Sequence, residues 1–118
     1  MTSNDSRLRI KQIQSVTTVE FIDRNILDEA NIQAIGEEIG QIIGKAATPK
    51  VLINFANVDH LSSAALGTLI TINTKIRNKD GKLCLTNIDP QIYEVFVITR
   101  LNQLFNIKES MDDALKSF

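Results

Sequence analysis

Two short runs of consecutive apolar residues constrain the fold of this chain more than any other feature. The runs are Val51–Ile53 and Leu83–Leu85, and an uninterrupted apolar run is typical of a strand that is covered on both faces. Between them lies a segment that begins at Ser62 or Ser63 and ends in a turn at Asp80-Gly81, with apolar residues at helical spacing. We expect the core face of this helix to be formed by Leu66, Leu69, Ile70 and Ile76. Strand, helix and strand in this order favour a sheet with helices packed against it and right-handed crossovers between parallel strands.

The residues before the first run predict two strands and one helix. Residues 7–11 and 18–21 alternate between polar and apolar side chains, which indicates an antiparallel pair of half-covered strands. A helix then begins with Asp28 as its N-cap. Its apolar face is predicted to contain Ala30, Ile32, Ile35, Ile39, Ile42 and Ile43, and its glycines Gly36, Gly40 and Gly44 share one flank that could permit close packing.

The residues after the second run predict a helix, a short strand and a final helix. Asp89-Pro90 is a strong helix start, because Asp accepts free backbone N–H groups and Pro has no N–H to lose. Tyr93, Phe96 and Val97 are expected to pack this helix against the core. A strand follows near residues 104–107, and Ser110 with Asp113 resembles a capping box for a helix that ends at Phe118.

Composition indicates one domain and excludes several classes of function. The 118 residues, of which 43% are hydrophobic, suffice for a single α/β domain spanning residues 1–118. A net charge of -1 gives no basic footprint for nucleic acid. No apolar run approaches the ~20 residues that membrane insertion requires, so we expect a soluble, cytoplasmic protein.

The reactive side chains are too few for a metal centre or a catalytic site. Cys84 is the only cysteine and His60 the only histidine, which excludes an internal disulfide and any His/Cys metal cluster, and no cofactor is expected. Although His60 is close to Ser63 in sequence, no oxyanion loop or orienting carboxylate accompanies them. We therefore expect no enzymatic activity, and we expect Cys84 to be a small buried residue of a strand.

The polar loop that leads into the second helix carries the functional signal. Ser62-Ser63-Ala64-Ala65-Leu66-Gly67 resembles the Asp-Ser-Ser/Thr-Gly-Leu-Gly motif of the STAS family, the anti-sigma-factor antagonists of bacteria. With Leu66-Gly67 as the anchor, the serine that the family's partner kinase phosphorylates corresponds to Ser63, and Ser62 stands where the family has an acid. Ile26-Leu27-Asp28 lies at the family's Gly-Glu-Leu-Asp turn, with Asn25 in place of the glycine, which Asn can replace in a left-handed conformation. Residues 98–105 also look like the family's stretch before the last strand.

The resemblance implies a STAS-like mixed sheet of about five strands with about four helices packed against it. It also implies a regulator that docks a serine kinase that doubles as an anti-sigma factor, and that is switched by phosphorylation of Ser63; a serine phosphatase would be a further partner. The docking patch expected from it comprises Asn25, Asp28, Asn57, Asp59, His60, Ser62 and Ser63.

Four other hypotheses remain open at this point. One hydroxyl of the Ser62-Ser63 pair could serve only as a helix N-cap, and Ser62 rather than Ser63 could be the modified residue. The chain could also be an unphosphorylated adaptor, the STAS subunit of a phospholipid-transport ABC complex. Finally, a cleft near the start of the second helix could hold a small anion.

Overall fold

The fold is a mixed α/β sandwich built on one five-stranded sheet. The computed structural model describes residues 8–26 and 29–118. Its strands are β1 (Leu8–Ile13), β2 (Val16–Phe21), β3 (Asn25–Ile26), β4 (Lys50–Asn54), β5 (His60–Leu61), β6 (Lys82–Thr86) and β7 (Asn106–Lys108). Its helices are α1 (Glu29–Lys45), α2 (Ser63–Asn78), α3 (Pro90–Ile98), α4 (Leu101–Leu104) and α5 (Met111–Lys116).

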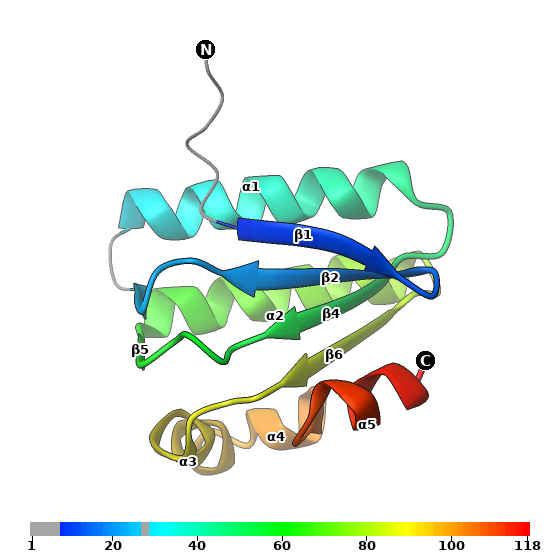
Figure 1. The fold of residues 1–118 in the computed structure, drawn as a ribbon. Coiled ribbons are helices and arrows are strands. Elements are labelled where there is room, and N and C mark those ends of the chain that lie inside the picture. Colours follow the sequence, from blue (N-terminus) through cyan, green and yellow to red (C-terminus); the bar gives the residue numbers. More distant parts are fainter. Residues whose placement is uncertain (1–7, 27–28) are drawn as a thin grey trace.

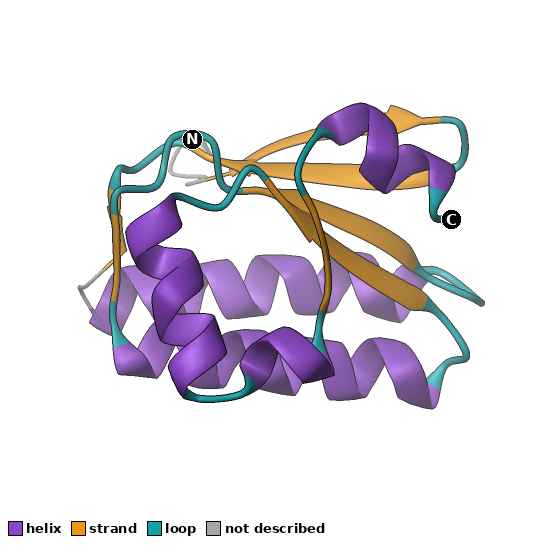
Figure 2. Cartoon of the chain, turned by 90° about the horizontal axis from the view of Figure 1, so that it is seen from below, coloured by secondary structure: helices purple, strands orange, loops and turns teal. Residues whose placement is uncertain are grey.

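The main sheet has the strand order β1-β2-β4-β6-β7. β1 is antiparallel to β2, and the pairs β2–β4, β4–β6 and β6–β7 are parallel. Figures 1 and 2 show α1 and α2 lying side by side on one face of this sheet, while α5 lies on the opposite face. β3 and β5 form a separate two-stranded parallel ladder at the end of the molecule where α1 and α2 begin. The predicted fold class and the opening antiparallel pair are confirmed.

The sheet is covered on both faces in its centre. Val51 and Ile53 of β4 are fully buried in the main core beneath α1 and α2, whereas Leu52 is fully buried in a smaller core beneath α5. Cys84 of β6 and Ala114 of α5 belong to that smaller core. The uninterrupted apolar runs therefore mark strands that are buried on both sides, as the sequence indicates.

The packing of α1 against α2 depends on one of the three glycines rather than on all of them. A Cβ atom added at Gly36 would lie 3.1 Å from Thr68 Cγ2, so the absence of a side chain there permits close packing. A Cβ atom at Gly40 would meet only Lys75 Nζ, at 3.9 Å, and one at Gly44 would meet nothing within 4 Å. The expected glycine flank is thus correct at Gly36 and wrong at Gly44.

Several predicted core positions are exposed instead. Ile70, Tyr93 and Val97 are 36%, 40% and 45% exposed, and Ala30 is also exposed. On α3 the buried pair is Ile92 and Phe96. The pairs Ile92/Phe96 and Tyr93/Val97 both have the i, i+4 spacing that places residues on one helix face, so spacing alone does not select between them. On α2, Ile72 and Asn73 are buried in addition to Leu66, Leu69 and Ile76.

A short additional helix displaces the last strand along the chain. The left-handed conformation of Arg100, with φ of 62°, separates α3 from α4. β7 consequently begins at Asn106 rather than near residue 104. The capping residues are as predicted, because Asp89 accepts a hydrogen bond from Gln91 N at 2.8 Å and Ser110 accepts one from Asp113 N at 3.2 Å.

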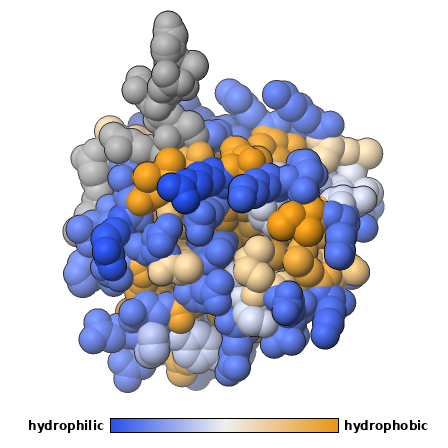
Figure 3. All heavy atoms as spheres, in the orientation of Figure 1, coloured by the Kyte–Doolittle hydropathy of each residue, from blue (hydrophilic) through white to orange (hydrophobic). Residues whose placement is uncertain are grey.

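The surface is predominantly polar on the face that carries β1 and α5. Figure 3 shows apolar atoms there as separate patches between hydrophilic side chains. In the part of the chain that the structure describes, no helix has the length and apolar character needed to cross a membrane.

Candidate functional site

The motif serines lie at the end of the sheet where the parallel strands finish and α2 begins. The chain leaves β4 at Asn54, forms the two-residue strand β5 and enters α2 at Ser63. In Figure 1 this is the end of the molecule at which β5 is labelled, and the first turns of α1 and α2 lie there together. We call the residues Asn25, Asn57, Asp59, His60, Ser62 and Ser63 the Ser63 surface.

Two buried apolar side chains fix the loop between β4 and β5. Phe55 is 0% exposed and Val58 1% exposed. The Phe55 ring packs against Phe21 at the end of β2, with 5.2 Å between the ring centroids. Phe55 N donates to Thr86 O at 2.9 Å, which ties the loop to the neighbouring strand β6. The polar residues of this loop are therefore held on a rigid base.

Backbone hydrogen bonds join this loop to the segment before α1. Asn25 and His60 are register partners in the β3–β5 ladder. Arg24 O accepts hydrogen bonds from Asp59 N at 2.7 Å and from His60 N at 3.2 Å, and Ile26 O accepts one from Ser62 N at 3.1 Å. Asn25, Asp59, His60 and Ser62, which are distant in sequence, are thereby brought together.

Asn25 does not adopt the conformation that its place in the motif suggests. It lies in the extended ladder of β3 and is absent from the described residues with positive φ, which include Asn87 and Arg100. The expectation of a left-handed Asn25 is wrong, because pairing with His60 requires extended backbone at this position.

Arg24 is a member of this site that the sequence motif does not reveal. Its Nε atom donates to Asp59 Oδ2 at 2.9 Å in an exposed ion pair. The guanidinium offsets the negative charge of Asp59 near the start of α2, where the first turn contains no acidic residue. The only signal in the sequence is an arginine beside Asn25, which is not specific.

The two serines have different structural roles. Ser62 is the N-cap of α2 and its side chain accepts a hydrogen bond from Ala65 N at 3.2 Å. Ser63 is the first residue of the helix, and its side chain is exposed and has no hydrogen-bond partner among the described residues. The N-cap hypothesis is thus correct for Ser62, and Ser63 is the hydroxyl that is open to solvent.

The remaining predicted residues are placed less directly. Asn57 is exposed, and its side-chain Nδ2 donates to Phe21 O at 3.3 Å. Asp28, expected both as the N-cap of α1 and as a docking residue, lies outside the described residues. Within the described ranges, no hydrogen bond joins His60 to Ser63, and no group of three or more His, Cys, Asp or Glu side chains is arranged to hold a metal ion.

A shallow hollow of about 180 Å³ adjoins the start of α2. It corresponds in position to the cleft expected for an anion, and its lining includes Asp59, the carboxylate that pairs with Arg24. Its other lining residues come from β5, α2 and α3 and are His60, Leu61, Leu66, Gln91, Ile92 and Val95. The sequence does not indicate the contribution of α3, because Val95 belongs neither to the predicted core face nor to the expected docking patch.

Cys84 is not part of the Ser63 surface, and its thiol is buried. Burial raises the pKa of the Cys84 thiol above its ordinary value of 9.0, while a hydrogen bond from Ser117 and the charge of Lys108 act in the opposite direction. The side chain is 0% exposed, as expected for a small residue inside a strand.

Comparison with known proteins agrees with this architecture. A solved anti-sigma-factor antagonist (STAS) domain protein from Planctomyces limnophilus superimposes with a TM-score of 0.84 at 21% identity, over 93% of this chain and 96% of that chain. The phosphorylated form of the Bacillus cell fate determinant SpoIIAA gives a TM-score of 0.69 at 16% identity, over 93% and 97% of the two chains.

Sequence comparison points to the same group of proteins. The anti-sigma-B factor antagonist of Staphylococcus epidermidis is 24% identical over 102 residues, which are 85% of this chain and 94% of that protein. The family model for the STAS domain matches residues 7–114. This chain therefore belongs to the STAS domain family.

Proposed function

We propose that this protein is an anti-sigma-factor antagonist that docks a serine kinase acting as an anti-sigma factor, and that phosphorylation of Ser63 switches the docking off. The Ser63 surface is the contact, and unmodified protein is the binding form. A serine phosphatase restores that form. The protein acts through binding alone and has no turnover of its own.

The observation that carries the proposal is the contrast between the two serines. The Ser62 hydroxyl is engaged as a helix cap, whereas Ser63 exposes its hydroxyl to solvent on the first turn of α2. A kinase needs an accessible hydroxyl, and Ser63 offers one. The similar proteins include antagonists of anti-sigma factors and one solved in a phosphorylated form, and this supports the same function.

Electrostatics explains how one phosphate would act on a partner without unfolding the domain. A phosphate adds roughly -1.5 to -2 charges and several acceptor oxygens. On Ser63 these charges face the positive end of the α2 dipole, where no acidic side chain competes in the first turn. The modification is tolerated by the fold and is felt by whatever covers the Ser63 surface.

The test compares three forms of the protein as bait. Wild type, Ser63→Ala and Ser63→Asp are immobilised and exposed to lysate of the source cells, and the captured proteins are quantified by mass spectrometry. We expect wild type and Ser63→Ala to capture a serine kinase of the histidine-kinase-like ATPase type. Ser63→Asp should bind this kinase at least about tenfold more weakly, which corresponds to about 1.4 kcal/mol.

Phosphorylation is then tested with the captured kinase and ATP. Wild type and Ser62→Ala should be phosphorylated at Ser63, and Ser63→Ala should not be phosphorylated. Equal capture of ABC-transporter subunits by all three baits, with neither serine phosphorylated, would overturn the proposal. Phosphorylation that is lost in Ser62→Ala and retained in Ser63→Ala would contradict the assignment of the residue.

A further inference from the structure

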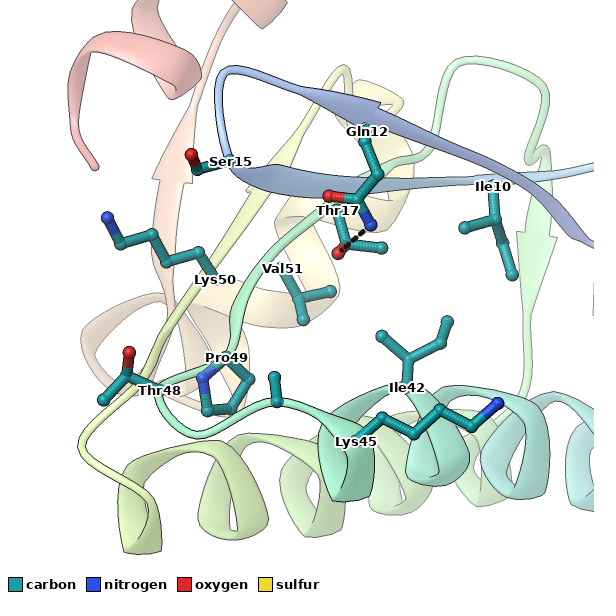
Figure 4. A pocket seen from close by; sticks show the side chains of 11 residues that line it. Ile10, Gln12, Ser15, Thr17, Ile42, Lys45, Thr48, Pro49, Lys50 and Val51 are labelled. Carbon is teal, nitrogen blue, oxygen red and sulfur yellow. Dashed lines mark hydrogen bonds between the residues drawn. The ribbon is translucent and has the colours of Figure 1, made fainter.

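A hollow of about 360 Å³ opens at the end of the sheet opposite to the Ser63 surface. It lies between the β1–β2 hairpin, the end of α1 and the segment that leads into β4 (Figure 4). β4 begins beside it at Lys50, whereas Ser63 follows the other end of that strand. The hollow is therefore a separate feature, and its volume is in the range of small-molecule sites.

One wall of the hollow is apolar. Ile10 of β1 and Ile42 of α1 point toward one another across it in Figure 4, and the buried Val51 of β4 lies to one side of them. Ile10 is 39% exposed, which leaves apolar area that a bound molecule could cover. An unbranched apolar group laid along Ile10 and Ile42 would remove that area from water.

The remaining lining is largely polar. It includes Ser15 and Thr48. Gln12 Nε2 donates to Thr17 Oγ1 at 2.7 Å, which orders both side chains at its roof (Figure 4). These groups can donate or accept hydrogen bonds, so they tolerate a polar head group without selecting its charge.

Positive charge is the selective element. Lys45 and Lys50 are the only charged residues that line the hollow, and neither forms an ion pair with a described residue. Lys79 Nζ already donates to Ile43 O at 2.9 Å and to Gly44 O at 3.3 Å, so the end of α1 is capped without help from Lys45. Among the described residues, no acidic side chain competes with an anion for either ammonium group.

We propose that this hollow binds a small organic monoanion with an unbranched apolar body, namely a medium-chain carboxylate. The chain would lie along the apolar wall and the carboxylate would reach Lys45 or Lys50. The two ammonium groups lie at opposite sides of the hollow in Figure 4. Because they are separated, one compact phosphate group cannot meet both of them, so a multiply charged phosphate is disfavoured. A nucleotide is disfavoured because no aromatic side chain lines the hollow.

The test is a titration of the ¹⁵N-labelled full chain with butanoate, hexanoate and octanoate, followed by NMR. We expect octanoate to shift the amide signals of residues 10–17 and 45–51 and to leave those of residues 59–66 unchanged. Full burial strengthens binding about fourfold per CH₂, so in this open hollow we expect about twofold per CH₂ from butanoate to octanoate. Octanol, which has the same chain without the charge, and acetate, which has the charge without the chain, serve as controls.

Charge variants locate the head group. Lys45→Gln and Lys50→Gln are surface changes, and we expect the variant whose lysine meets the carboxylate to bind octanoate about threefold more weakly. The double variant should lose at least as much, and Lys116→Gln, a matched change on α5, should bind as wild type does. The proposal would be overturned if acetate or octanol bound as tightly as octanoate. It would also be overturned if both single variants bound octanoate as tightly as wild type does. Shifts that cluster at residues 59–66 would do the same.

Discussion

Replacing the two motif serines one at a time should separate a structural hydroxyl from a free one. Ser62→Ala removes the acceptor that holds Ala65 N at 3.2 Å, and Ala65 is only 5% exposed, so water compensates poorly for the lost bond. Loss of an N-cap costs about 1 kcal/mol of unfolding free energy. For a domain of this size, that corresponds to a fall in Tm of about 4 °C.

Ser63 should behave differently under the same measurement. Ser63→Ala removes a hydroxyl without a described partner, so we expect a change within about 0.5 kcal/mol. Ser63→Asp places a negative charge in a first turn that has no acid and should stabilise by about 0.3–1 kcal/mol. Urea denaturation and thermal melts followed by circular dichroism give both quantities, with unchanged m-values as the check on two-state unfolding.

The comparison also has a clear opposite outcome. If Ser63→Ala lost about 1 kcal/mol while Ser62→Ala were neutral, the capping roles would be reversed and Ser63 could not be the free hydroxyl. A fall in stability for Ser63→Asp would show that the α2 N-terminus does not accept negative charge, and would refute the reasoning about phosphate.

Further outcomes follow from packing and burial. Gly44→Ala should stabilise α1 by up to about 1 kcal/mol, because a Cβ atom there meets nothing within 4 Å. Gly81→Ala should destabilise the protein strongly, because its Cβ atom would clash with Pro49 O. Chemical denaturation measures both changes. Leu66→Asp should abolish the cooperative melt, because this 9% exposed side chain lies in the core and an unpaired charge there costs several kcal/mol. Cys84 should resist a thiol reagent at pH 8 until the protein is denatured. Because the pKa of the Cys84 thiol is raised in the folded state, the unfolded chain releases the proton first, and stability should fall as the pH rises through 9.0. Urea titrations at several pH values measure this fall. If the thiol is responsible, the Cys84→Ser variant should not show it.

The sequence predicts the elements of this fold well because its local signals agree with one another. The apolar runs of β4 and β6 and the caps Asp89 and Ser110 each depend on neighbouring residues only, and each is confirmed. Which face of a helix is buried depends on contacts between distant residues. The Tyr93/Val97 pair has the same spacing as the buried Ile92/Phe96 pair, so only the packed structure distinguishes them.

In the candidate site, too, features set by neighbouring residues are predictable, and features set by contacts between distant residues are not. The position of Ser63 at the start of α2 follows from the motif, whereas the β3–β5 ladder consists of two residue pairs too short to leave a periodic pattern. That ladder brings Asn25 to His60 and makes the backbone of Asn25 extended, contrary to the left-handed conformation inferred from the motif alone. Arg24 joins the site only through its contact with Asp59.

The different roles of Ser62 and Ser63 explain how a phosphate can be added and removed at this position without disturbing the fold. A hydroxyl that caps a helix has its oxygen committed to a backbone N–H, so adding a phosphate to it would remove the bond to Ala65 N that helps to start α2. The neighbouring Ser63 has no such commitment among the described residues. A phosphate there leaves the cap in place and lies at the favourable end of the helix dipole. Phosphorylation of Ser63 therefore leaves the domain folded. Under the function we propose, its effect is to lower the affinity for the partner.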